Sequence, residues 1–241
     1  AYGALLLWAL SGVSDGSIAY IVGEFLSYHP LFIAAAWALG SATLNGCSMQ
    51  PGTRRSLGLL TGTMVLWLLG NAAFIWTFSI RHETVAAFSI GDGFFILGDL
   101  AMIVALLTVP RRSPCRYPSL HAILDLMIVL AGSSVLFWDL IVRPTLGTPD
   151  STMVMLSRTV YPMLAVGYLM SANWIRNSGG TTEGRATWKI IYWAVTAYAV
   201  AEGFYQLIEL TASAPQWYYA ISEFLYVGSY LGFQAAGYRF L

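Results

Sequence analysis

Long apolar runs separated by short polar connectors make up almost the whole chain. The runs show no strict alternation of apolar and polar positions, and about 20 such residues suffice for a helix to cross a bilayer. The first run is shorter than this, which indicates that the natural chain begins upstream. The sequence therefore predicts an all-α polytopic membrane protein that forms one integral membrane domain, 1–241. Its eight predicted transmembrane helices are about 1–13 (incomplete), 17–45, 56–79, 85–109, 119–142, 152–175, 187–210 and 216–238.

The composition excludes several classes of function. Hydrophobic residues make up 57% of the chain and charged residues 10%, whereas soluble domains carry roughly 25% charged residues. A soluble enzyme and a disordered tail are therefore excluded. The 12 basic residues are matched by 12 acidic ones, so the chain has no basic surface for nucleic acid.

The basic residues predict the orientation, because lysine and arginine concentrate in cytoplasmic connectors. Nine of the twelve fall on one side of the predicted spans. That side is predicted to be cytoplasmic, and it includes the C-terminus at Leu241. The nine residues are Arg54, Arg55, Arg111, Arg112, Arg116, Arg176, Arg185, Lys189 and Arg239.

Two stretches of the chain match at an offset of 131 residues. Residues 70–74 (GNAAF) parallel residues 201–205 (AEGFY), and an acidic residue follows each stretch at the same spacing, as Asp92 and as Glu223. His29-Pro30 loosely echoes Tyr161-Pro162. The pattern predicts a parallel repeat of four spans, related by an axis along the membrane normal. Chance similarity between two apolar hairpins is the alternative.

Polar residues inside the predicted spans mark a candidate site. A charge at the bilayer centre costs at least ~2.5–3.5 kcal/mol, so such residues face the protein interior and have partners. Seven carboxylates fall inside spans, namely Glu24, Asp92, Asp99, Asp125, Asp139, Glu202 and Glu223. One layer, in the outer third of the membrane, is predicted to form a ligand-binding pocket. Its candidate residues are Glu24, Asn71, Asp92, Arg158, Tyr161, Glu202, Tyr205 and Glu223.

The same layer permits two other interpretations. Its residues can bond to one another and lock the helices together without any ligand. A divalent cation held by the four carboxylates of the layer is a weaker alternative, since no histidine supports it. Asp99 and Asp125 lie nearer the cytoplasmic half and are expected to cap helices or pair locally, with a proton relay as the alternative.

No pattern in the chain indicates catalysis. A nucleophile–base pair, a phosphate-binding glycine loop and an HExxH motif are all missing. We therefore predict no enzyme activity, no catalytic residue and no metal ligand. His29, His82 and His121 lie at different predicted depths, which argues against a haem with two axial ligands. Lys189 lies at the end of its span, where it does not suit a retinal Schiff base. The cofactor remains open.

Several short segments resemble the multi-span N-terminal membrane regions of bacterial GGDEF and EAL proteins, which act in cyclic di-GMP signalling. Residues 89–98 (SIGDGFFILG) are similar to one family pattern, and residues 123–129 (ILDLMIV) to another. Tyr161-Pro162 and residues 201–205 resemble two more. Ala165 departs from the family, which often carries Asp at that position. The resemblance implies a sensory domain of the bacterial inner membrane that signals to a cytoplasmic output domain or partner.

The leading hypothesis is thus a non-catalytic sensory or regulatory domain with a polar pocket in the outer third of the bilayer. The alternative is an accessory or scaffold subunit of a larger respiratory or photosynthetic membrane complex, and a transporter is a third possibility. Expected partners are membrane lipids, other membrane subunits or a second copy of the chain, and the cytoplasmic output. Nucleic acid is not among them.

Overall fold

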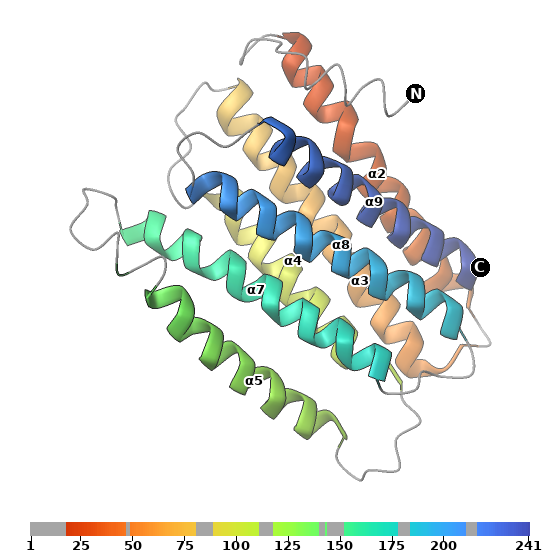
Figure 1. Cartoon of the computed structure of the whole chain (residues 1–241). Coiled ribbons are helices and arrows are strands. Elements are labelled where there is room, and N and C mark those ends of the chain that lie inside the picture. Colours follow the sequence, from red (N-terminus) through yellow and green to blue (C-terminus); the bar gives the residue numbers. More distant parts are fainter. Residues whose placement is uncertain are drawn as a thin grey trace.

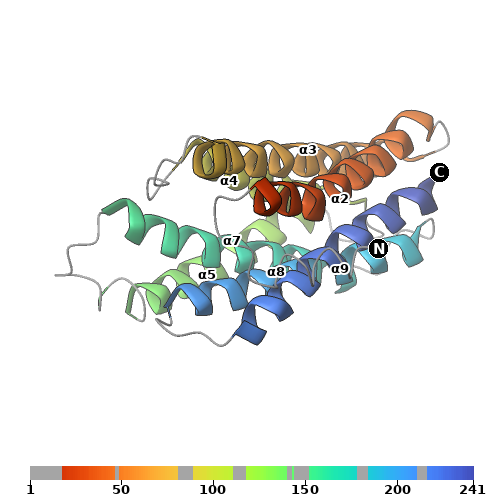
Figure 2. The same cartoon turned by 90° about the horizontal axis from the view of Figure 1, so that it is seen from above.

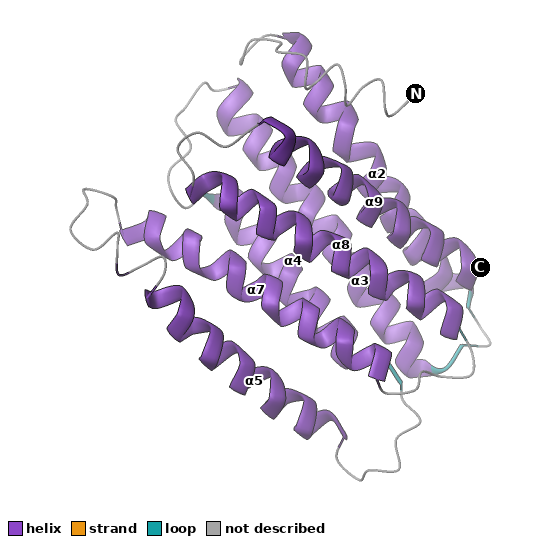
Figure 3. Cartoon of the chain, viewed as in Figure 1, coloured by secondary structure: helices purple, strands orange, loops and turns teal. Residues whose placement is uncertain are grey.

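The described part of the chain is all-α, as the sequence predicts. The computed structural model describes residues 18–46, 49–80, 89–110, 118–139, 143, 152–177, 184–210 and 216–241. Within these ranges it contains seven α-helices, one π-helical turn and no strand (Figures 1 and 3). The elements are α2 (Ile18–Asn45), α3 (Pro51–Phe74), η1 (Ile75–Ile80), α4 (Ile90–Leu107), α5 (Pro118–Phe137), α7 (Thr152–Asn177), α8 (Arg185–Leu210) and α9 (Gln216–Phe240).

Two helix starts differ from the predicted ones. Helix α3 begins at Pro51, five residues before the predicted span, so Arg54 and Arg55 belong to its first turns. A proline in the first turn loses no hydrogen bond, and its fixed φ suits the helix. Helix α4 begins at Ile90, where Ser89 caps it, five residues after the predicted start. The predicted first span, 1–13, lies outside the described residues.

Six of the helices form a closed ring in which each packs against the next. The order around the ring is α2, α3, α4, α7, α8 and α9, and α9 returns to pack against α2. Helix α5 packs on the outside, against α7. Seen from above, α2, α3 and α4 form one layer, and α5, α7, α8 and α9 form the other (Figure 2).

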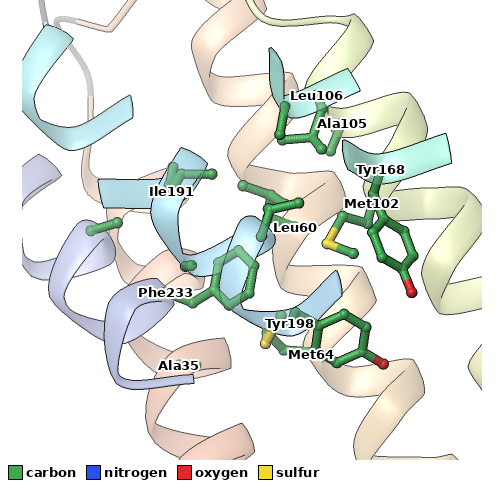
Figure 4. Packing of buried hydrophobic residues seen from close by; sticks show 14 of the residues in the cluster. Ala35, Leu60, Met64, Met102, Ala105, Leu106, Tyr168, Ile191, Tyr198 and Phe233 are labelled. Atoms are coloured by element: carbon green, nitrogen blue, oxygen red, sulfur yellow. The ribbon is translucent and has the colours of Figure 1, made fainter. Parts of the chain in front are cut away.

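The core fills the interior of this ring. Several large side chains there are 2% exposed or less, and they come from both layers (Figure 4). Examples are Phe32, Leu60, Trp67, Met102, Tyr168, Ile191 and Phe233. The seam between α2 and α9 is especially close: a β-carbon at Gly237 would lie 2.6 Å from the carbonyl carbon of Ala38. Small residues permit this approach of two helix backbones.

The outer surface of the ring is strongly apolar. Trp37 is 71% exposed and Leu44 is 73% exposed, and monomeric soluble proteins rarely expose large apolar patches. Two helical segments in the described residues, Pro51–Thr77 and Ile90–Leu107, are long and apolar enough to cross a membrane, with mean hydropathies of 1.6 and 2.0. These features are compatible with membrane association.

Candidate functional site

Asp92 lies in the first turn of α4, nearer the helix start than the sequence-based depth predicts. It forms a capping box with Ser89: the Ser89 amide donates to Asp92 Oδ2 at 2.7 Å, and the Asp92 amide donates to Ser89 Oγ at 3.4 Å. Serine followed three residues later by an acidic residue is the local pattern that starts a helix in this way. The Asp92 side chain is thereby fixed at the end of α4, with 7% of the residue exposed.

Tyr161 joins Asp92 from the other layer. Its hydroxyl, on α7, donates to Asp92 Oδ1 at 2.6 Å. One oxygen of the carboxyl group thus caps α4 and the other accepts a bond from α7. Hydrogen bonds to charged groups are about twice as strong as neutral ones, so this contact holds the two layers together where α4 begins.

Asp99 lies two turns further along α4, roughly 10 Å from Asp92 along the helix axis. It is 1% exposed, and its Oδ1 accepts a hydrogen bond from Trp67 Nε1 at 3.1 Å. Trp67 comes from α3 and is fully buried. The expected local pairing of Asp99 is therefore a bond between two neighbouring helices of the same layer.

Glu202 on α8 accepts two tyrosine hydroxyls. Tyr226 of α9 donates to its Oε1 at 2.8 Å, and Tyr198 of α8 donates to it as well. Tyr198 also stacks on Trp67, with ring centroids 4.2 Å apart and an interplanar angle of 9°. The two stacked rings therefore connect the two acids, because Trp67 donates to Asp99 and Tyr198 donates to Glu202.

Tyr168 of α7 completes this cluster. It is fully buried, and its ring lies 5.6 Å from that of Tyr198. The two hydroxyls point in the same direction in Figure 4. Tyr168 interacts electrostatically with both Asp99 and Glu202. Its hydroxyl nevertheless has no hydrogen-bond partner among the described residues.

The structure brings together only part of the predicted pocket. Asp92 meets Tyr161, but the Asn71 side chain donates to the Trp67 carbonyl of its own helix at 3.1 Å. Tyr205 is 41% exposed, and Glu223 is half-buried. Glu24 and Arg158 lie on α2 and α7, and their side chains fall outside the described ones.

Sequence reasoning missed the aromatic residues that hold the acids. Trp67, Tyr168, Tyr198 and Tyr226 were not singled out, although one signal was present. Trp67 and Tyr198 are separated by 131 residues, the offset of the predicted repeat. Equivalent positions in a two-fold repeat can meet at the axis, so this pair could have been selected from the sequence.

The chemistry of the cluster is that of oxygen atoms and aromatic rings. Among the described residues, no group of three His, Cys, Asp or Glu side chains could hold a metal ion. Every lysine or arginine side chain that the structure describes is exposed, so Asp99 and Glu202 have no cationic partner from that set. The arrangement can exchange a cation or a hydrogen bond, but the described side chains contain no nucleophile paired with a base.

A cavity of about 220 Å³ lies away from this cluster, between α5, α7 and the end of α4. Asp92 is at the opposite end of α4, so the cavity does not coincide with the predicted outer pocket. The cavity is lined by Leu107, Asp125, Leu126, Met170, Ser171, Asn173 and Trp174.

No protein-family model matches the chain, and comparisons with curated proteins and with solved structures likewise gave no match. The functional argument therefore rests on the geometry above and on the sequence patterns.

Proposed function

We propose that the chain is a non-catalytic sensory or regulatory domain of a bacterial inner membrane, with eight spans and a cytoplasmic C-terminus. A ligand or another signal acts at the outer polar layer, and the helices pass the change to a cytoplasmic output. The apolar outer surface, the one-sided distribution of arginine and lysine, and the resemblance to membrane regions of GGDEF and EAL proteins support this proposal.

The observation that carries the proposal is the Tyr161–Asp92 hydrogen bond. It joins α7 to α4, two helices from different layers, at the position where α4 begins. A ligand that takes Asp92 as its own partner removes this bond and changes how the layers pack. A signal requires such a difference, because a ligand that binds two packings equally shifts neither.

The proposed architecture is a parallel repeat, in which α2, α3 and α4 correspond to α7, α8 and α9. The ring order favours this correspondence, since α4 meets α7 as α9 meets α2. Pro30 and Pro162 both lie inside the first helix of their unit. Trp67 and Tyr198, at equivalent positions, stack on each other, as residues on a two-fold axis do.

The first experiment is a thermal-stability screen of small polar compounds on the purified protein, in detergent, because a ligand that binds the native state raises its unfolding temperature. We expect a compound that stabilises the wild type but acts at least about tenfold more weakly on Tyr161→Phe and Asp92→Asn. Arg158→Ala should also lose the response. Asp139→Asn is the matched control, since Asp139 is exposed and pairs with Arg143 at 3.5 Å. Equal responses in the Asp92 variant and the wild type would refute the site.

The alternative of an accessory subunit is favoured by tryptophans on the outer surface. Trp37, Trp193 and Trp217 are 71%, 59% and 54% exposed, and aromatic residues are enriched in the cores of protein interfaces. Gentle purification from native membranes distinguishes the two functions. A sensor is expected to purify alone or as a dimer and without colour. A stoichiometric partner together with a visible or near-infrared absorption band would establish the subunit instead.

A further inference from the structure

A second polar cluster, the axial cluster, lies deeper in the ring than the Asp92–Tyr161 pair and takes no part in the proposed signal. It consists of Asp99, Glu202 and Tyr168, together with the stacked rings of Trp67 and Tyr198. Asp99 and Glu202 interact electrostatically, and each accepts a hydrogen bond from one ring of the stack. Two acids and a hydroxyl thus converge from α4, α8 and α7.

Two features of the axial cluster are unexplained by the contacts within it. The Tyr168 hydroxyl is fully buried and has no hydrogen-bond partner among the described residues, although leaving a buried polar group unpaired is costly. The bond from Trp67 uses Oδ1 of Asp99, and no described group donates to Oδ2. Both acids also lack a described cationic side chain, and two carboxylates in a water-poor interior need a compensating charge.

We propose that the axial cluster binds one monovalent metal cation, Na⁺, between the Asp99 and Glu202 carboxylates and the Tyr168 hydroxyl oxygen. All three groups offer oxygen, the donor that hard cations prefer. The neighbouring rings pack with centroids 4.2 to 5.6 Å apart, which leaves space for an ion rather than for an organic molecule. A divalent ion fits less well, because a set of three acidic ligands is missing from the described residues.

The exposure of the two acids indicates how the ion enters. Glu202 is half-buried, whereas Asp99 is 1% exposed, so the ion reaches Glu202 first and Asp99 last. Once bound, it connects α4 of one layer to α7 and α8 of the other. It therefore stabilises the closed ring, independently of what binds to Asp92 at the start of α4.

The test is thermal unfolding of the purified full chain in detergent, with NaCl replaced stepwise by choline chloride at constant ionic strength. At a Na⁺ concentration 100 times the dissociation constant, we expect the unfolding temperature to rise by about 5–10 °C. Asp99→Asn and Glu202→Gln should abolish the rise. Tyr168→Phe keeps both acids and adds no bulk, and it should weaken the Na⁺ affinity several-fold.

The matched controls are Asp139→Asn and Tyr219→Phe, which change an exposed acid and an exposed tyrosine and should retain the full rise. Equal stability in NaCl and choline chloride would overturn the proposal and leave a buried water as the partner of Tyr168. A rise that persists in Asp99→Asn and Glu202→Gln would also overturn it, because Na⁺ would then bind elsewhere. Neither result bears on the ligand response of Asp92, which the stability screen measures separately.

Discussion

Closure of the six-helix ring depends on Gly237, and replacing it by alanine tests that closure. A β-carbon at this position would lie 2.6 Å from the carbonyl carbon of Ala38 and 2.7 Å from the amide nitrogen of Leu39. Both are backbone atoms, so no rotation of a side chain relieves the clash. Helices α2 and α9 would have to separate by about 0.8 Å to restore an ordinary contact of 3.4 Å.

The matched control is Gly228→Ala, which lies on the same helix and has no heavy atom within 4 Å of the added β-carbon. Both substitutions gain the helix propensity of alanine, about 1 kcal/mol. Overpacking costs Gly237→Ala a further ~1–3 kcal/mol. The difference between the two variants should therefore be about 1–3 kcal/mol, or about 2–12 °C in unfolding temperature for a chain of this size.

The assay is the apparent unfolding midpoint of both purified variants and the wild type, measured in one detergent at one scan rate. Gly237→Ala should unfold at the lowest temperature, and Gly228→Ala at or above that of the wild type. If Gly237→Ala equals or exceeds Gly228→Ala, then α2 and α9 do not pack backbone to backbone and the ring is open at that seam.

Three further substitutions give testable outcomes. Trp67→Phe removes the donor to buried Asp99 and should lower the free energy of unfolding by about 1–3 kcal/mol, whereas Trp193→Phe, at an exposed ring, should leave a denaturant titration unchanged. Ser89→Ala removes the cap of α4 and should cost about 0.5–2 kcal/mol in the same titration. Gly98→Ala places a β-carbon 2.7 Å from the Trp67 ring and should alter tryptophan fluorescence and lower stability, while Gly93→Ala, with open space around it, should do neither.

The helices themselves follow from the sequence, because long apolar runs have few alternatives to a helix. Their ends depend on local groups that hydropathy does not register. Pro51 extends α3 toward its N-terminus, and the Ser89–Asp92 capping box delays the start of α4 to Ile90. That delay also explains the error in the depth of Asp92, since the residue caps a helix instead of lying two turns inside it.

The candidate site was predictable only in part, for a physical reason. A buried acid is rare enough to be noticed, so Asp92, Glu202 and their layer could be selected from the sequence. Its aromatic partners could not, because the chain has 9 Trp and 14 Tyr and most of them suit lipid contact equally well. Which ones meet depends on the ring: α3 and α8 face each other across its interior, and this brings Trp67 against Tyr198.

The contact between α2 and α9 sets the order in which the protein can be assembled on the ribosome. The two helices are neighbours in the ring, yet 170 residues separate Asn45 from Gln216. At about 5–20 residues per second, translation needs roughly 10–30 s to bridge that interval. Throughout that time the face of α2 that receives α9 has no permanent neighbour. The nascent chain must keep this face among lipids or under an insertion chaperone until the last helix arrives.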